Sequence, residues 1–94
     1  MTFERDETKN AANVKKHGIS FEEAVLVFDE PVFSRIDRRF EYGEERIVSI
    51  GLIGAIVMVV VVHTARNGKT RIISARTASR DERRNYDKHQ QKTT

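Results

Sequence analysis

The hydrophobic and polar positions at the start of the chain predict two helices. Gly18 follows a polar run over residues 7–17, and a glycine at this place commonly takes the left-handed conformation that ends a helix. Ser20 then offers an N-cap, and Glu23 lies at the capping-box spacing, so we expect a second helix to begin at once. Its hydrophobic positions recur at i, i+3, i+4 and i+7, as in a helix that faces a core, at Phe21, Ala24, Val25 and Phe28.

After Pro31, which stops a helix, the pattern changes to that of β-strands. The Asn67-Gly68 dipeptide suits a type I′ turn and predicts a hairpin around it. Residues 57–62 show no polar alternation, so we expect them at the centre of the sheet with both faces covered. The predicted strands are residues 32–36, 46–53, 55–64 and 70–76.

The end of the chain repeats the helix-start signal. Ser79 is the expected N-cap and Glu82 follows at the capping-box spacing, which predicts a helix through about residue 88, with residues 90–94 as a flexible tail. The order of elements therefore predicts an α+β fold, with two N-terminal helices, an antiparallel sheet of about four strands and a C-terminal helix. A chain of 94 residues builds one core, so we expect a single domain over residues 1–94.

The uncharged run over residues 47–62, IVSIGLIGAIVMVVVV, raises the alternative of a membrane-spanning helix. It is shorter than the roughly 20 residues that a span needs. Valine and isoleucine dominate it, and β-branched side chains favour pleated strands. Because Gly51 and Gly54 interrupt the run, we expect two strands and no membrane association.

The positive charge is concentrated near the C-terminus. Residues 1–65 hold 8 Lys and Arg against 11 Asp and Glu, whereas residues 66–94 hold 9 against 3. A basic segment of this kind suits nucleic acid or an acidic partner. The chain has no cysteine, and its start lacks the charged and apolar blocks of a secretory signal, so we expect a cytoplasmic protein.

Two helix faces carry candidate functional residues. On the first helix, Lys9, Asn13, Lys16 and His17 share one face, which is either a solvated surface or a cationic binding ridge. On the last helix, like charges stand beside one another, an arrangement that suits a phosphate or carboxylate partner as well as a solvated helix. These cations are Arg80, Arg83, Arg84 and Lys88.

Further arginines lie on or beside the predicted strands. Strand alternation predicts that Arg71 and Arg76 leave opposite faces of the sheet. Arg66 belongs to the hairpin turn and Arg46 opens a strand. If several of them converge, they form a cationic cleft. His63 ends the apolar run, where a histidine is more often a hydrogen-bonded structural residue than a catalytic one.

No metal-ligand spacing, glycine-rich phosphate loop or nucleophile elbow is present, so we predict no metal site and no cofactor. Metal-free cleavage of RNA needs none of these, because the RNA supplies its own 2′-hydroxyl nucleophile. The protein must orient that hydroxyl, accept its proton, protonate the leaving oxygen and offset the phosphate charge. His17, a carboxylate from Glu44 or Glu45, and the arginines have the right chemistry, although spacing alone does not bring them together.

The chain resembles the BrnT family of toxins over residues 3–86. The combination of KHGISFEEA near the start with RIISAR before the last helix carries most of the resemblance. It extends to an ordered set of further positions: Lys9, Asn13, Val27-Phe28-Asp29, Gly43-Glu44-Glu45-Arg46, Gly51, Glu82-Arg83-Arg84 and Tyr86.

The resemblance implies a RelE-like compact α+β fold and a metal-independent ribonuclease that inhibits translation. It also implies neutralisation by a BrnA-type antitoxin with a ribbon-helix-helix DNA-binding part, in a complex of two toxins and two antitoxins. Operator DNA would then be contacted only through the antitoxin. The candidate catalytic residues are His17, Arg46, Arg66 and Arg76, and the candidate RNA-binding residues are Lys16, Arg71, Arg80, Arg83 and Arg84.

Two other functions fit the same residues. A non-catalytic protein could bind RNA or the ribosome and arrest growth while leaving transcripts intact. A regulatory partner of a ribbon-helix-helix repressor would instead be harmless when expressed without its neighbour.

Overall fold

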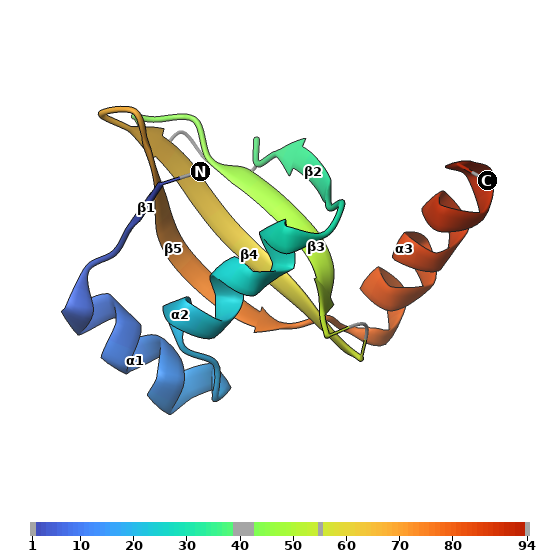
Figure 1. The fold of residues 1–94 in the computed structure, drawn as a ribbon, viewed down its shortest axis with the longest axis horizontal. Coiled ribbons are helices and arrows are strands. Elements are labelled where there is room, and N and C mark those ends of the chain that lie inside the picture. Colours follow the sequence, from blue (N-terminus) through green and yellow to red (C-terminus); the bar gives the residue numbers. More distant parts are fainter. Residues whose placement is uncertain (1, 39–42, 55, 94) are drawn as a thin grey trace.

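The computed structural model describes the backbone of residues 2–38, 43–54 and 56–93 and the side chains of these residues through Lys88. Its sheet has five strands in the order β1-β5-β4-β3-β2 (Figure 1). The strands are β1 (Phe3–Glu4), β2 (Phe33–Ile36), β3 (Ile47–Ile53), β4 (Val57–Arg66) and β5 (Lys69–Thr77). Ala55, where the sequence predicts the third strand to begin, lies outside the described residues.

The predicted α+β class is confirmed, but the sheet differs from the predicted one. All pairings are antiparallel except that of β1, which runs parallel to β5. The sheet is therefore mixed and has five strands instead of about four. The sequence did not predict β1 because two residues are too few to show an alternating pattern.

The helices are α1 (Glu7–His17), α2 (Phe21–Ala24), the 3-10 helix η1 (Val25–Asp29) and α3 (Arg80–Thr93). Gly18 ends α1 with φ of 75°, and Ser20 and Glu23 form both hydrogen bonds of the capping box. The predicted second helix is one α-helical turn that tightens into η1, a change that is common at helix ends. The last helix continues to Thr93 and does not end near residue 88.

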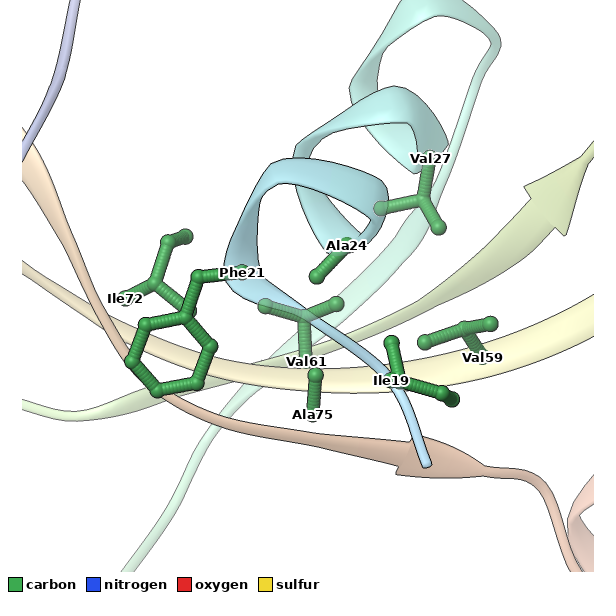
Figure 2. Packing of buried hydrophobic residues seen from close by; sticks show 8 residues of the cluster. All are labelled: Ile19, Phe21, Ala24, Val27, Val59, Val61, Ile72 and Ala75. Carbon is green, nitrogen blue, oxygen red and sulfur yellow. The ribbon is translucent and has the colours of Figure 1, made fainter. Parts of the chain in front are cut away.

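α1, α2 and η1 cover one face of the sheet, and the core lies between them and the strands (Figures 1 and 2). Val59 and Val61 on β4 are fully buried in this core, and Val60, which points to the other face, is only 3% exposed. β4 is thus the central strand with both faces covered, as the apolar run predicts. The core residues are Ile19, Phe21, Ala24, Val27, Val59, Val61, Ile72 and Ala75.

Both glycine interruptions of the apolar run have a structural role. Gly54, with φ of 61°, lies between β3 and β4, so the run forms two strands as predicted. Gly51 lets η1 and the segment after it approach β3, because a Cβ atom on it would lie 3.3 Å from Val27 Cβ of η1 and 2.8 Å from Val32 Cγ1. Among the described residues, no helix is long and apolar enough to cross a membrane.

The hairpin between β4 and β5 has the predicted Asn67-Gly68 turn, with φ of 53° and 76°. Farther along, the register shifts between Val62 and His63: Val62 is opposite Ser74, but His63 is opposite Ile72. This β-bulge gives β5 one extra residue and reverses its alternation. Arg71, opposite Thr64, and Arg76, opposite Val60, therefore share one face, and the prediction that they leave opposite faces is wrong.

Asn13 joins α1 to the outer edge of β5. Its side-chain amide donates to the carbonyl oxygens of Ile19 and Ala75, both at 2.8 Å, and accepts from the Ala75 amide at 3.1 Å. The side-chain amide thus makes the hydrogen bonds of a neighbouring strand at a position of β5 where no described strand pairs on this side. Asn13 is 7% exposed, so it does not belong to a solvated ridge with Lys9 and Lys16.

Candidate functional site

The face of the sheet opposite α2 carries Arg76, one of the candidate site residues. Phe33, Ile50, Val60 and Arg76 lie directly opposite one another on successive strands and so point to this face. We call it the α3 face, because Tyr86 of α3 packs edge-on against Phe33 with ring centroids 5.4 Å apart.

Arg76 is held on the α3 face by a bidentate ion pair. Its Nη1 and Nη2 atoms donate to Glu82 Oε1 and Oε2 at 2.7 and 2.8 Å. This fork-to-carboxylate geometry fixes the guanidinium plane as well as its position. The pair also attaches the first turn of α3 to the end of β5.

Glu82 has a second partner that keeps it in place. The Ser79 amide donates to Glu82 Oε1 at 2.8 Å, and the Glu82 amide donates to Ser79 Oγ at 3.2 Å, so the predicted capping box is formed. The Arg76 guanidinium and the Ser79 amide lower the pKa of Glu82 to about 2. The carboxylate is therefore ionised at neutral pH and is a poor general base.

Three further arginines form a second positive surface on α3. Arg80, Arg83 and Arg84 are exposed and, with Ala78 and Asp87, line a groove of about 470 Å³. We call Arg76, Arg80, Arg83 and Arg84 the C-terminal arginine cluster. The three helical arginines share one surface, as the sequence predicts, whereas Glu82, which holds Arg76, lies on the opposite side of the helix with Asn85 and Tyr86.

The other predicted arginines lie at the hairpin end of the sheet. Arg66 ends β4 and Arg46 immediately precedes β3, whose Ile47 is opposite His63. Arg71 Nη1 lies 3.3 Å from Glu4 Oε1, and Arg71 Nη2 lies 3.9 Å from Asp6 Oδ2. Arg76 is opposite Val60, so Arg66 lies about 20 Å from it along the strand direction. One phosphate cannot contact both groups.

The carboxylates near Arg46 form a separate small cluster at this end. Arg46 Nε lies 3.6 Å from Glu44 Oε1. The Glu45 carbonyl oxygen accepts a 2.6 Å hydrogen bond from Thr64 Oγ1, which fixes the segment before β3. The Glu44 carboxylate thus lies beside Arg46, as the spacing in the sequence suggests.

Lys16 and His17 lie in the last turn of α1, in the helical layer on the opposite face of the sheet from the α3 face (Figure 1). Lys16 is exposed and His17 is partly buried. In the described part of the chain, neither side chain has a hydrogen bond or ion pair to a candidate arginine. The structure therefore does not bring His17 together with Arg46, Arg66 or Arg76.

His63 has a structural environment. It is 9% exposed, its Nε2 shares a 2.7 Å hydrogen bond with Ser49 Oγ, and its ring packs edge-on against Phe28 at 5.1 Å. Ser49 in turn shares a 2.7 Å hydrogen bond with Ser34. Burial lowers the pKa of His63, so the ring is neutral at pH 7, as the structural interpretation of this residue predicts.

Sequence reasoning missed three residues of the α3 face: Phe33, Arg35 and Asn85. They come from β2 and α3, which are far apart in the chain, and no local pattern joins them. Asn85 stands between the arginines and Tyr86 in the last motif, and its polar character beside them was the one available signal. Among the described residues, no group of three or more His, Cys, Asp or Glu could hold a metal ion.

Comparison with known proteins identifies a family for nearly the whole chain. Residues 6–82 match the family described as the ribonuclease toxin BrnT of a type II toxin-antitoxin system. No curated protein matches the chain. A solved structure, the ribonuclease toxin BrnT of Brucella abortus, is similar with a TM-score of 0.63 and 24% identity, over 85% of this chain and 99% of that chain. At this identity the likeness establishes a shared fold.

Proposed function

The chain belongs to the BrnT family of ribonuclease toxins of type II toxin-antitoxin systems, and from this premise we propose that it cleaves RNA without a metal ion and thereby inhibits translation. Its partner is then a BrnA-type antitoxin with a ribbon-helix-helix part, in a 2:2 complex that contacts operator DNA through the antitoxin. Its place of action is the cytoplasm, where its RNA substrate is found. We also propose that its fold is RelE-like.

The observation that carries the proposal is the C-terminal arginine cluster. Arg76 is fixed by Glu82 at 2.7 and 2.8 Å on one side of α3, and three exposed arginines lie on the other side of the same helix. RNA carries one phosphate per nucleotide, and arginine binds phosphate through two parallel hydrogen bonds. We place the RNA backbone along this cluster.

In the proposed reaction the 2′-oxygen of the RNA attacks the adjacent phosphorus atom while the bond to the 5′-oxygen breaks. A base takes the 2′-hydroxyl proton, and an acid returns a proton to the 5′-oxygen. Arg76 offsets the charge that develops on the phosphate oxygens, and its rigid pairing with Glu82 means that little reorganisation is needed. Glu82 orients Arg76 and does not act as the base, because its pKa is about 2.

We divide the arginines predicted as site residues into two groups by their place in the fold. Arg76, Arg80, Arg83 and Arg84 are the proposed RNA contacts at one end, whereas Arg66 lies about 20 Å from Arg76 along the strand direction, with Arg46 and Arg71 between these two points. His17 and Lys16 remain candidates for contacts to a longer RNA. The acidic segments of an antitoxin would fit the same positive surface as RNA, which provides a simple means of inhibition.

One observation favours the second candidate function, an inhibitor that binds RNA or the ribosome without cutting. The carboxylate in contact with Arg76 is fully ionised and already accepts three hydrogen bonds, so it has no role in proton transfer. A chain without a base near Arg76 would bind RNA and leave it intact.

Induction in cells distinguishes these functions. We expect expression of the chain alone to stop growth and to give fragmented transcripts, and co-expression with the antitoxin to restore growth. At equal expression, Arg76→Ala tests the site at the C-terminal arginine cluster, and His17→Ala tests the proposed contact of α1 with a longer RNA. Growth arrest with intact transcripts would contradict ribonuclease activity, and harmless expression would indicate a purely regulatory partner.

A further inference from the structure

A pocket of about 220 Å³ lies between α3 and the strands of the α3 face. Phe33, Val48 and Ile50 line it from β2 and β3, and Glu82, Asn85 and Tyr86 line it from α3. Pockets for drug-sized ligands measure about 300 to 1,000 Å³. The smaller volume suits a single ring system.

The walls of the pocket suit a planar aromatic ligand. Phe33 and Tyr86 meet edge-to-face at an interplanar angle of 82°, so their rings form a corner. Tyr86 is 6% exposed, which keeps its ring in a fixed position. Val48 and Ile50 are partly buried and add an apolar surface beside this corner. Stacking of bases on such aromatic surfaces is a general means of binding unpaired nucleotides.

Two polar side chains, Asn85 and Arg35, lie at the rim of the pocket. Asn85 is exposed, and its amide has no hydrogen-bond partner among the described residues. Such an amide both donates and accepts, as the edge of a base requires. Arg35, also exposed and without an ion pair in the described part of the chain, lies at the same rim and suits a phosphate.

The pocket adjoins the proposed path of the RNA backbone. Glu82 lines the pocket, and the same carboxylate holds Arg76 of the C-terminal arginine cluster at 2.7 and 2.8 Å. A nucleotide whose phosphate contacts Arg76 therefore has its base within reach of the pocket. This adjacency favours RNA over an isolated small molecule.

We propose that this pocket binds one unpaired base of the RNA, with Phe33 and Tyr86 contacting its ring, Asn85 recognising its edge and Arg35 binding a neighbouring phosphate. The pocket then determines which nucleotide is selected. This inference rests on the proposed action on RNA, and it assigns the base preference to a site outside the arginine cluster.

Binding to four non-cleavable RNAs tests the proposal. The probes are 2′-O-methylated pentanucleotides UUXUU, in which X is A, C, G or U, titrated into isotope-labelled protein and followed by NMR. We expect amide shifts centred on Val48 and Asn85, and an affinity for one base at least about fivefold above that for the weakest. Equal affinity for all four, or shifts confined to the hairpin end, would overturn the proposal.

Two variants separate base recognition from general binding. Asn85→Ala should bring the four affinities to within about twofold of one another, whereas Phe33→Leu, which keeps the pocket apolar, should weaken all four and preserve their order. Asp81→Ala, an exposed change on the same helix outside the pocket lining, is the control. An unchanged preference in Asn85→Ala would refute its role.

The outcome is independent of catalysis, because the probes lack a free 2′-hydroxyl. A chain that cuts RNA but binds all four probes alike would contradict the pocket assignment and leave the proposed function intact. A chain that discriminates among the probes but cuts no RNA would contradict the ribonuclease proposal alone.

Discussion

Glu82 of α3 and His63 of β4 are stabilised in opposite charge states. Glu82 is stabilised in its ionised form by Arg76 and Ser79, whereas His63 is surrounded by Phe28 and Ser49 and is stabilised as the neutral ring. Each makes the stability of the fold depend on pH in a separate range.

Glu82 should contribute stability that acid removes. Its pKa falls from 4.5 to about 2 on folding, so its contribution is present above pH 4.5 and is lost as the pH falls toward 2. We expect Glu82→Gln to be less stable than the parent at pH 7 and to lose this part of the pH dependence. Urea unfolding between pH 7 and pH 2 measures it. If the free energy of unfolding depended on pH in the same way for parent and variant, the ion pair with Arg76 would contribute nothing to stability.

His63 should make the fold less stable in weak acid. Burial lowers its pKa below the ordinary value of 6.5, so the unfolded chain takes up a proton first and stability declines as the pH falls below 6.5. His63→Gln keeps a polar partner for Ser49 and cannot titrate in this range. We expect its melting temperature to change less between pH 7.5 and 5.5 than that of the parent. An identical decline in both proteins would exclude His63 as the cause.

At the scale of elements, local signals predicted most of the fold. The Gly18 end of α1, the two capping boxes and the Asn67-Gly68 turn each depend on residues that are adjacent in the chain. The β-bulge next to His63 does not, because it reflects how β5 fits its neighbour. This one irregularity places Arg71 and Arg76 on the same face.

The attachment of α1 to β5 also escaped prediction, since Asn13 reaches a residue 62 positions away. Asn13→Ala would leave the Ala75 amide and carbonyl and the Ile19 carbonyl without their partner, at a cost of about 2 to 4 kcal/mol. Asn13→Asp can still accept from the amide but turns a carboxylate oxygen toward two carbonyl oxygens in a buried site, and we expect a loss at least as large. Lys15→Ala, at an exposed position on α1, is the control for chemical unfolding. A loss below 1 kcal/mol for Asn13→Ala would contradict the edge-closing role.

At the scale of the molecule, the candidate site was the least predictable feature. The sequence identified the basic residues correctly as a C-terminal excess, but their distribution over two ends of the sheet depends on register, which composition does not determine. Likewise, the pocket beside Tyr86 joins β2, β3 and α3. Such a juxtaposition arises only when the whole chain is folded.

The proposed activity of the molecule depends most on Arg76, which Glu82 holds beside the first turn of α3. Its most direct test is the initial rate of RNA cleavage by the purified chain in excess EDTA. The parent should cut an all-ribose oligonucleotide and leave its 2′-deoxy counterpart intact, because the attacking hydroxyl is absent.

In the same assay Arg76→Ala should reduce the rate by about 10²- to 10³-fold, the usual effect of removing one fixed donor to a developing anion. Arg5→Ala, which removes an arginine paired with Glu7 and Glu22 near α1, should stay within about twofold of the parent. Cleavage at the parent rate by Arg76→Ala, with both proteins folded, would contradict the central claim.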